Sequence, residues 1–224
     1  MTSGSAHTSG RRRRHARGEG MLLQDEILNA AVTVIGRTGD ADAMSIRALA
    51  SEVGVTAPSI YRHFADKAAI LRAVLARSFS QFEQHLEAAA TGSRSPFTRL
   101  RRRSEAYLEF ANQQPGQYRL LFSAASLGPR QLGLDGQPHP GAGSYEALVQ
   151  SVEACINAGA QPDGSATQVA LQLWSTLHGY ADLKIGKPEL TWPPDRILVG
   201  RLLRSLQLDR PASTGATKPS RRPQ

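Results

Sequence analysis

The chain has 224 residues, of which 40% are hydrophobic, and this is enough for one large or two small helical domains with buried cores. Its net charge of +8 lies mainly at the ends, since residues 1–20 hold five Arg and one Glu and residues 209–224 hold four basic residues against Asp209. A single cysteine, Cys155, excludes an intramolecular disulfide, and the absence of a membrane-length apolar run excludes a transmembrane helix, which together indicate the cytoplasm.

Residues 1–20 are predicted to form a disordered basic arm. They consist largely of Ser, Gly and Thr around a run of arginines, and this composition cannot bury enough apolar surface to become ordered. No apolar core follows the charges, so the segment is not a secretory signal. Two interpretations remain open, a solubilising tail and an arm that follows the DNA backbone or enters the minor groove. Residues 209–224, rich in Pro, Ser, Thr and Arg, are predicted to be a disordered tail.

Residues 21–67 predict a three-helix unit that contains a helix-turn-helix. The first helix is predicted to run from about residue 21 to residue 37, and the glycines near residue 37 are expected to end it. Ser45 suits the N-cap of the second helix, because its hydroxyl can accept a hydrogen bond from an orphan N–H. Gly54 follows the apolar stripe of that helix and can take the left-handed conformation that ends it. Thr56 is the expected cap of the third helix.

The spacing within this unit fits two helices that cross at close range near a right angle. Such a crossing needs a small residue on the first helix, a glycine at the turn and an apolar residue on the second helix. Ala50, Gly54 and Ile60 supply these in order, and Pro58 occupies the first turn of the second helix, where its missing N–H costs nothing. The second helix can then lie in a major groove of DNA, although spacing alone also fits a hairpin that only packs.

The residues that follow favour DNA binding. After the third helix come Tyr61-Arg62-His63-Phe64, then Ala65-Asp66-Lys67 and Ile70-Leu71. This pattern resembles the signature of the tetracycline-repressor (TetR) family of bacterial regulators, and the resemblance covers residues 22–75. It implies that Tyr61 and Lys67 hold phosphates on either side of the groove, while Phe64 anchors the recognition helix. The predicted DNA-binding residues are Ser45, Arg47, Thr56, Ala57, Pro58, Ser59, Tyr61, Arg62, His63 and Lys67.

A second helical domain is predicted over residues 68–208. A long helix from about Asp66 to Ala90 leads into it from the DNA-binding unit. Ser95 and Pro96 mark the start of the next helix, whose early arginines are expected to form a solvated face because they lie outside the motif. The remaining predictions are an aromatic helix at 118–122, a surface loop at 124–143, and helices at 144–156, capped by Ser144, at about 165–185 and at about 194–208.

Aromatic side chains collect in this second domain. They form either an ordinary helical core or a mostly apolar cavity with a few polar groups. Trp174-Ser175-Thr176-Leu177-His178-Gly179 resembles the Trp-x-x-x-His-Gly element of one TetR-family ligand-domain subclass, and the family resemblance implies such a cavity. The predicted ligand-binding residues are Phe82, Tyr107, Phe110, Phe122, Cys155, Trp174 and His178.

The sequence gives no sign of a catalytic site. His178 invites a metal or catalytic interpretation, but it has no second His or Cys at ligand spacing, and a His on an apolar helix is more often a core or pocket residue. No phosphate loop, dinucleotide fingerprint or nucleophile elbow is present. We therefore expect no cofactor, no metal and no enzymatic activity.

The expectation is an all-α, homodimeric transcription regulator, and specifically a repressor released from a near-palindromic double-stranded DNA operator by an unknown small-molecule ligand. The alternatives are an activator or architectural DNA binder and, from a different class, a helical enzyme using His178. A dimer surface is expected on the last two helices, which carry more apolar side chains than one buried stripe needs. These are Val169, Leu171, Leu173, Leu177, Leu183, Ile197, Leu198, Leu202, Leu203 and Leu206.

Overall fold

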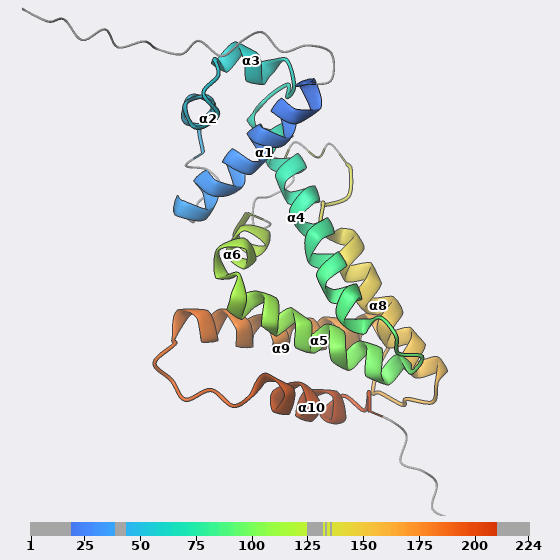
Figure 1. Ribbon diagram of the computed structural model, residues 1–224. Coiled ribbons are helices and arrows are strands. Elements are labelled where there is room, and N and C mark those ends of the chain that lie inside the picture. Colours follow the sequence, from blue (N-terminus) through green and yellow to red (C-terminus); the bar gives the residue numbers. More distant parts are fainter. Residues whose placement is uncertain (1–18, 39–43, 125–131, 133, 135, 210–224) are drawn as a thin grey trace, which may run out of the picture.

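The computed structural model describes residues 19–38, 44–124, 132, 134 and 136–209, and within these residues all regular structure is helical (Figure 1). The predicted all-α class is confirmed. Residues 1–18 of the predicted arm and residues 210–224 of the predicted tail lie outside the described residues. Glu19 and Gly20 were predicted to belong to the disordered arm, but they form the start of α1. The helices are α1 (Glu19–Thr38), α2 (Ile46–Val53), α3 (Ala57–Tyr61), α4 (Lys67–Ala90), α5 (Pro96–Gln113), α6 (Pro115–Ala124), α8 (Ala142–Asn157), α9 (Ala166–Gly186) and α10 (Asp195–Ser205).

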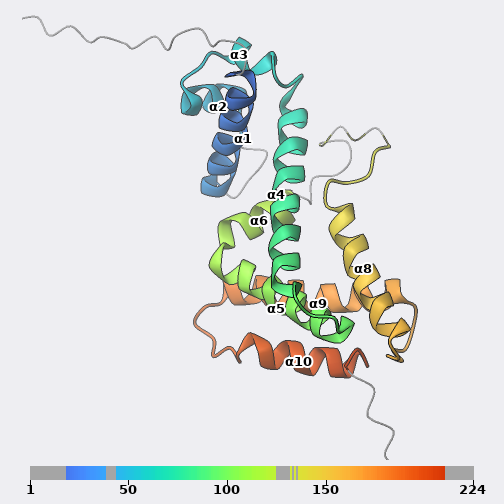
Figure 2. The same ribbon diagram turned by 45° about the vertical axis from the view of Figure 1, so that its right-hand side comes forward.

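The first three helices gather at one end of the molecule (Figures 1 and 2). α1 packs on α2 and α2 packs on α3, as the helix-turn-helix prediction requires. Ser45 caps α2, because its Oγ accepts a hydrogen bond from the N–H of Ala48 at 3.1 Å. Gly54 ends α2 with a φ of +75°, and the N–H of Val55 then bonds to the carbonyl of Ala50 at 2.9 Å. This bond is typical of a Schellman end and fixes the turn between α2 and α3.

The cap predicted for α3 differs in one respect. Thr56 has the extended backbone of an N-cap residue, but its hydroxyl makes no bond to the helix backbone. It lies instead 3.0 Å from Oγ of Ser59, so two side-chain hydroxyls satisfy each other on the outer face of the helix. Thr56 is therefore the N-cap residue of α3, as predicted, but the side-chain bond expected of it is absent, and Pro58 lies in the first turn of α3.

α4 connects the two ends of the molecule. Asp66 caps it, since its Oδ1 accepts a hydrogen bond from the N–H of Ala69 at 2.7 Å. Its 24 residues give a length of about 36 Å at about 1.5 Å per residue. Buried side chains recur every three or four residues along the whole helix, so that one continuous face packs inward: Ile70, Leu71, Val74, Leu75, Phe79, Phe82, Leu86 and Ala90.

The second domain is built around α5, which packs against α4, α6, α8, α9 and α10. Its N-cap is Ser95, and only Gln114 separates its last residue from Pro115 at the start of α6. α6 also packs on α1 and α4, so it contacts both the DNA-binding unit and the second domain. α9 and α10 lie at the end of the molecule opposite α3 (Figure 2).

Three predictions about this domain need correction. In the segment predicted as a surface loop, Leu132 and Leu134 are buried, and the carbonyl of Leu132 accepts a hydrogen bond from Arg72 of α4. α8 begins at Ala142 and not at Ser144, because the chain already turns when the N–H of Ala142 bonds to the carbonyl of His139 at 2.9 Å. α10 ends at residue 205 and not at about residue 208, because residue 207 has a φ of +54°, which is incompatible with a right-handed helix.

Candidate functional site

The helix-turn-helix presents its predicted DNA-binding residues around α3, on the outer surface of the unit. Arg47 of α2 is exposed, and Tyr61 at the end of α3 exposes 53% of its surface. Ser45, Thr56, Pro58 and Arg62 are also exposed, while Ala57, Ser59, His63 and Lys67 are half-buried.

Two buried side chains hold this surface in place. Ile60 is fully buried beneath α3, and Phe64 is buried immediately after it. The N–H groups of His63 and Phe64 both bond to the carbonyl of Ile60, at 2.9 and 3.0 Å, which turns the chain from α3 toward α4. Asp66 then caps α4, so that Lys67 is the first residue of that helix. The turn after α3 and the Asp66 cap therefore place Lys67 at the start of α4, close to α3 in the chain.

The two arginines of this surface differ in their partners. Nη2 of Arg62 donates to Oγ of Ser59 at 3.3 Å, which ties it to its own helix. For Arg47 the structure shows no partner among the described residues, so its guanidinium fork is available for a bidentate contact.

A cavity of about 360 Å³ lies in the second domain. α4, α5, α6, α8 and α9 all contribute to its wall, together with the residues just before α8. The lining residues are Phe79, Phe82, Leu86, Arg103, Ser104, Tyr107, Phe122, His139, Gly141, Ser144, Tyr145, Leu148, Trp174, Leu177 and His178.

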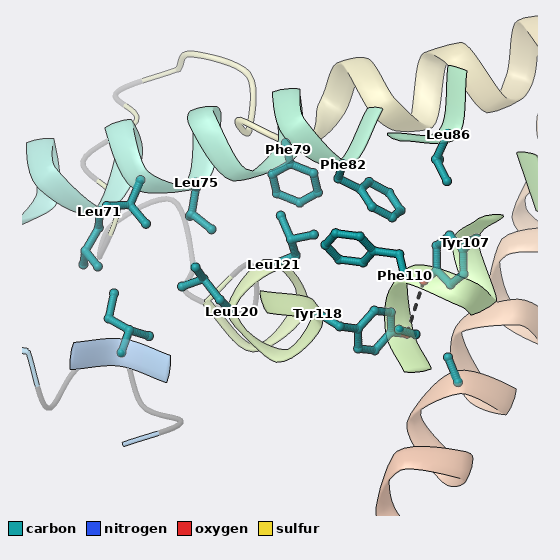
Figure 3. Packing of buried hydrophobic residues seen from close by; sticks show 14 of the residues in the cluster. Leu71, Leu75, Phe79, Phe82, Leu86, Tyr107, Phe110, Tyr118, Leu120 and Leu121 are labelled. Atoms are coloured by element: carbon teal, nitrogen blue, oxygen red, sulfur yellow. Dashed lines mark hydrogen bonds between the residues drawn. The ribbon is translucent and has the colours of Figure 1, made fainter. Parts of the chain in front are cut away.

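Aromatic rings make up much of this wall. Phe122 of α6 lies at their centre, with ring centroids 6.2 Å from Phe79 and Phe82 and 4.8 Å from His178. Figure 3 shows Phe79 and Phe82 of α4 facing the interior that Tyr107 also faces. Such an edge-to-face cluster suits an apolar or aromatic guest, since ring edges and faces attract one another at these distances.

A polar network occupies one side of the cluster. The hydroxyl of Tyr118 lies 2.6 Å from Nδ1 of His178. It also lies 3.3 Å from the hydroxyl of Tyr107 (Figure 3). Burial raises the pKa of Tyr118 to about 12 and also raises the pKa of Tyr107. Burial lowers the pKa of His178 below 6.5, although Asp182 opposes this shift. All three groups are therefore uncharged near neutral pH, and His178 is a hydrogen-bonded wall residue.

Arg103 does not belong to a solvated face, contrary to the sequence prediction. Only 7% of its side chain is exposed, because Nη1 bonds to Glu87 at 2.7 Å and Nη2 bonds to Glu83, both on α4. The burial of Arg103 could not be recognised from the sequence, because it lies among other arginines such as Arg99, which is 40% exposed. The two carboxylates are what allow a charged side chain to lie in the cavity wall.

The structure brings five of the seven predicted ligand-binding residues into the lining, while Phe110 and Cys155 lie outside it. Phe110 packs behind Phe82, with ring centroids 5.0 Å apart, and Cys155 is fully buried. Sequence reasoning missed lining residues that have no aromatic or motif signal of their own, namely Leu86, Arg103, Ser104, His139, Gly141, Ser144 and Leu148. Phe79 and Tyr145 are aromatic residues of this domain that were not among the predicted ligand-binding residues, and the phrase around Trp174 indicated His178 but not Leu177.

The surface predicted for the dimer divides into three sets. Val169, Leu173, Leu177 and Leu203 are buried inside the monomer, so this part of the apolar excess completes the core. Leu198, Leu202 and Leu206 are half-buried and pack against that core. The exposed set is Leu171, Leu183 and Ile197, with exposed fractions of 49%, 57% and 41%.

Comparisons with known proteins match both parts of the chain. The family model described as bacterial regulatory proteins of the tetR family matches residues 27–74, and the tetracyclin repressor-like C-terminal domain matches residues 100–206. An uncharacterized HTH-type transcriptional regulator of Mycobacterium tuberculosis is 29% identical over 164 residues, which are 73% of this chain and 71% of that protein. The Trp-x-x-x-His-Gly subclass is not established by these matches.

Two solved structures share the fold. A protein of unknown function from Rhodococcus sp. RHA1 superposes with a TM-score of 0.69 at 24% identity, over 90% of this chain and all of that chain. A bacterial regulatory protein in the tetR family from Rhodococcus RHA1 superposes with a TM-score of 0.63 at 19% identity, over 85% and 98% of the two chains. Within the described residues, none of the helices combines the length and the apolar character needed to cross a bilayer.

Proposed function

Because the chain belongs to the tetR family of bacterial regulatory proteins, we propose that it is a homodimeric repressor that leaves its operator when a small molecule fills the cavity. It is a transcriptional regulator with a DNA-binding helix-turn-helix. Residues 21–67 form the DNA-binding domain of this proposal, and residues 68–208 form the ligand-binding and dimerisation domain. The site of action is the cytoplasm, where a bacterial regulator meets chromosomal DNA.

The observation that carries the proposal is the course of α4. Its first residue, Lys67, lies beside the recognition helix, and its fourth and fifth turns place Phe79 and Phe82 in the cavity wall. One unbroken helix thus touches both the DNA-binding surface and the cavity. A ligand that favours one orientation of α4 over another shifts the population of DNA-binding conformations by its difference in affinity for them.

The DNA-binding surface is proposed to work with separate roles for its residues. Tyr61 and Lys67 hold phosphates and set the register, while Arg47 reads a guanine through O6 and N7. A two-fold dimer supplies two such surfaces, and its operator is then near-palindromic with half-site centres about 34 Å apart or slightly more. The exposed Leu171, Leu183 and Ile197 of α9 and α10 support a dimer surface on these helices.

DNA flanking the coding gene provides the test of DNA binding. Footprinting with the full chain should show a protected, near-palindromic site, and binding should weaken steeply as salt is raised. The matched control is Arg47→Ala with Lys67→Ala, which removes one base contact and one phosphate contact and should abolish the footprint. A site protected equally by both proteins would refute the assignment of this surface.

Transcription from that promoter separates a repressor from an activator or an architectural binder. A repressor lowers transcript yield in a purified system, an activator raises it, and an architectural binder protects many unrelated fragments. For the ligand, the full chain is purified under native conditions and extracted with solvent, and the extracted compounds are identified by mass. Adding an extracted compound back should weaken operator binding, whereas a compound that binds without changing DNA affinity contradicts release through the cavity.

A further inference from the structure

His139 stands just before α8 and has its proton placed by the backbone. Nδ1 of the ring accepts a hydrogen bond from the N–H of Gly141 at 3.0 Å. A neutral imidazole has one donor and one acceptor nitrogen, so this bond fixes the proton on Nε2. Burial lowers the pKa of His139 below 6.5, which favours this neutral form near neutral pH. The ring is therefore a donor at Nε2.

That donor has no partner among the described residues, although the atom is buried. His139 lines the cavity, and its ring meets Phe79 edge to face with centroids 6.0 Å apart. The ring has little freedom to turn away. Gly141 holds Nδ1, and a Cβ added at Gly141 would come within 2.5 Å of the Phe79 ring, so the backbone packs directly on that ring. Buried donors without partners are rare in native proteins and need an explanation, and a residue that lines a cavity can find its partner in a ligand.

The charge in the cavity wall is already balanced. Arg103 is the basic side chain of the described lining that is charged at neutral pH, and it is bound to Glu83 and Glu87. His139 and His178 both have their pKa lowered by burial. An anionic guest would lose its hydration without finding an unopposed positive charge, and that loss is costly in a largely aromatic cavity. A neutral guest loses far less.

From these observations we propose that the effector is a small uncharged molecule with an aromatic or aliphatic body and one carbonyl-type oxygen, which accepts a hydrogen bond from Nε2–H of His139. The proposal rests on the proposed function, because it assigns the chemistry of the same cavity. The volume of about 360 Å³ is near the lower end of ligand pockets, so the effector is a compact molecule. His139 is the residue that distinguishes an oxygen-bearing guest from a hydrocarbon of the same shape.

The test uses three probes of one shape. Acetophenone is uncharged and has a carbonyl oxygen, α-methylstyrene replaces that oxygen by a CH₂ group, and benzoate is an anion. Affinities for the full chain are measured by titration calorimetry near neutral pH. The quantity compared between proteins is the ratio of acetophenone to α-methylstyrene affinity, because the greater hydrophobicity of the hydrocarbon affects every protein equally.

The informative variant is His139→Asn. The Asn amide oxygen can replace Nδ1 as acceptor for the N–H of Gly141, while the donor at Nε2 is lost. The affinity ratio should fall about three- to tenfold, the usual value of one net hydrogen bond. His139→Gln places an amide donor near the position of Nε2 and should retain part of the preference. The matched control is His85→Asn, since Nε2 of His85 is also buried without a partner but His85 is not a lining residue. Its ratio should equal that of wild type.

The outcomes separate this proposal from the function it rests on. If both uncharged probes bind and the ratio is the same in wild type and His139→Asn, the role of His139 is overturned while the cavity remains a ligand site. Tighter binding of benzoate than of acetophenone to wild type overturns the uncharged effector and needs no variant. If none of the probes binds wild type, the compact uncharged effector is overturned, while the proposed function is decided separately by footprinting and by the extracted compounds.

Discussion

Replacing Arg103 by Met removes the charge from the cavity wall and keeps much of the length of the side chain. In wild type, Arg103 binds Glu83 and Glu87 across the α4 and α5 contact. Oε2 of Glu83 already has no partner within the part of the chain that the structure describes, and Glu83 exposes only 28% of its side chain. After the substitution this carboxylate is largely buried and unpaired, whereas Glu87, which exposes 48%, can turn to water.

The size of the effect follows from these exposures. Breaking a fully buried ion pair costs about 3–5 kcal/mol, because one charge is left uncompensated. Exposed pairs contribute about 0–1 kcal/mol. The Glu83 pair lies between these limits but nearer the first, so Arg103→Met should lower the free energy of unfolding by about 2–3 kcal/mol. The measurement is urea unfolding followed by far-ultraviolet circular dichroism, at one protein concentration because a dimer's stability depends on it.

Two further proteins make the result decisive. Arg99→Met breaks a pair with the same Glu87, but that arginine is 40% exposed, so the loss should stay below about 1 kcal/mol. Combining Arg103→Met with Glu83→Gln replaces the stranded charge by an amide and should recover at least about 1 kcal/mol. An Arg103→Met protein within about 0.5 kcal/mol of Arg99→Met would refute the argument from burial, and no recovery in the double variant would show that Glu83 is not the source of the loss.

The remaining predictions concern DNA binding, the turn, pH and the dimer. Lys67→Ala should weaken binding to all sequences about equally and lower the salt slope by about one unit in titrations on operator and random DNA, and an altered site preference with the same slope would contradict the phosphate contact. Gly54→Ala should cost about 1–2 kcal/mol in urea unfolding because its φ is +75°, whereas Gly36→Ala within α1 should be neutral or stabilising. Because burial lowers the pKa of His178 in the folded chain, the unfolded chain binds the proton first, and the free energy of unfolding should fall as pH drops below about 6.5 and on through the lowered pKa. His178→Phe should make the free energy of unfolding less dependent on pH in this range, and an unchanged dependence would contradict this role of His178. Ile197→Arg should give a folded monomer by light scattering, with normal helicity and weak operator binding, and a persistent dimer would place the interface elsewhere.

The sequence by itself determined the helix-turn-helix, since the interactions that define it span only a few residues. Ser45 caps the helix that starts next to it, and Gly54 ends that helix because only glycine takes its conformation cheaply. Asp66 likewise caps the long α4 within one turn. Local hydrogen bonds and backbone preferences can be read from neighbouring residues, so these elements and the all-α class were predictable.

Only the tertiary structure decided the composition of the cavity wall. Arg103 and Glu83 are 20 positions apart, and nothing near either residue predicts that they meet. His139 lies in a Pro- and Gly-rich segment that resembles a surface loop, yet it packs against Phe79 of α4 and becomes a wall residue whose Nε2 has no partner among the described residues. Phe110 has the residue type of a lining residue but is screened from the cavity by Phe82. Which face of a helix meets a cavity depends on the packing of distant helices, and that arrangement is set by the whole core rather than by any local pattern.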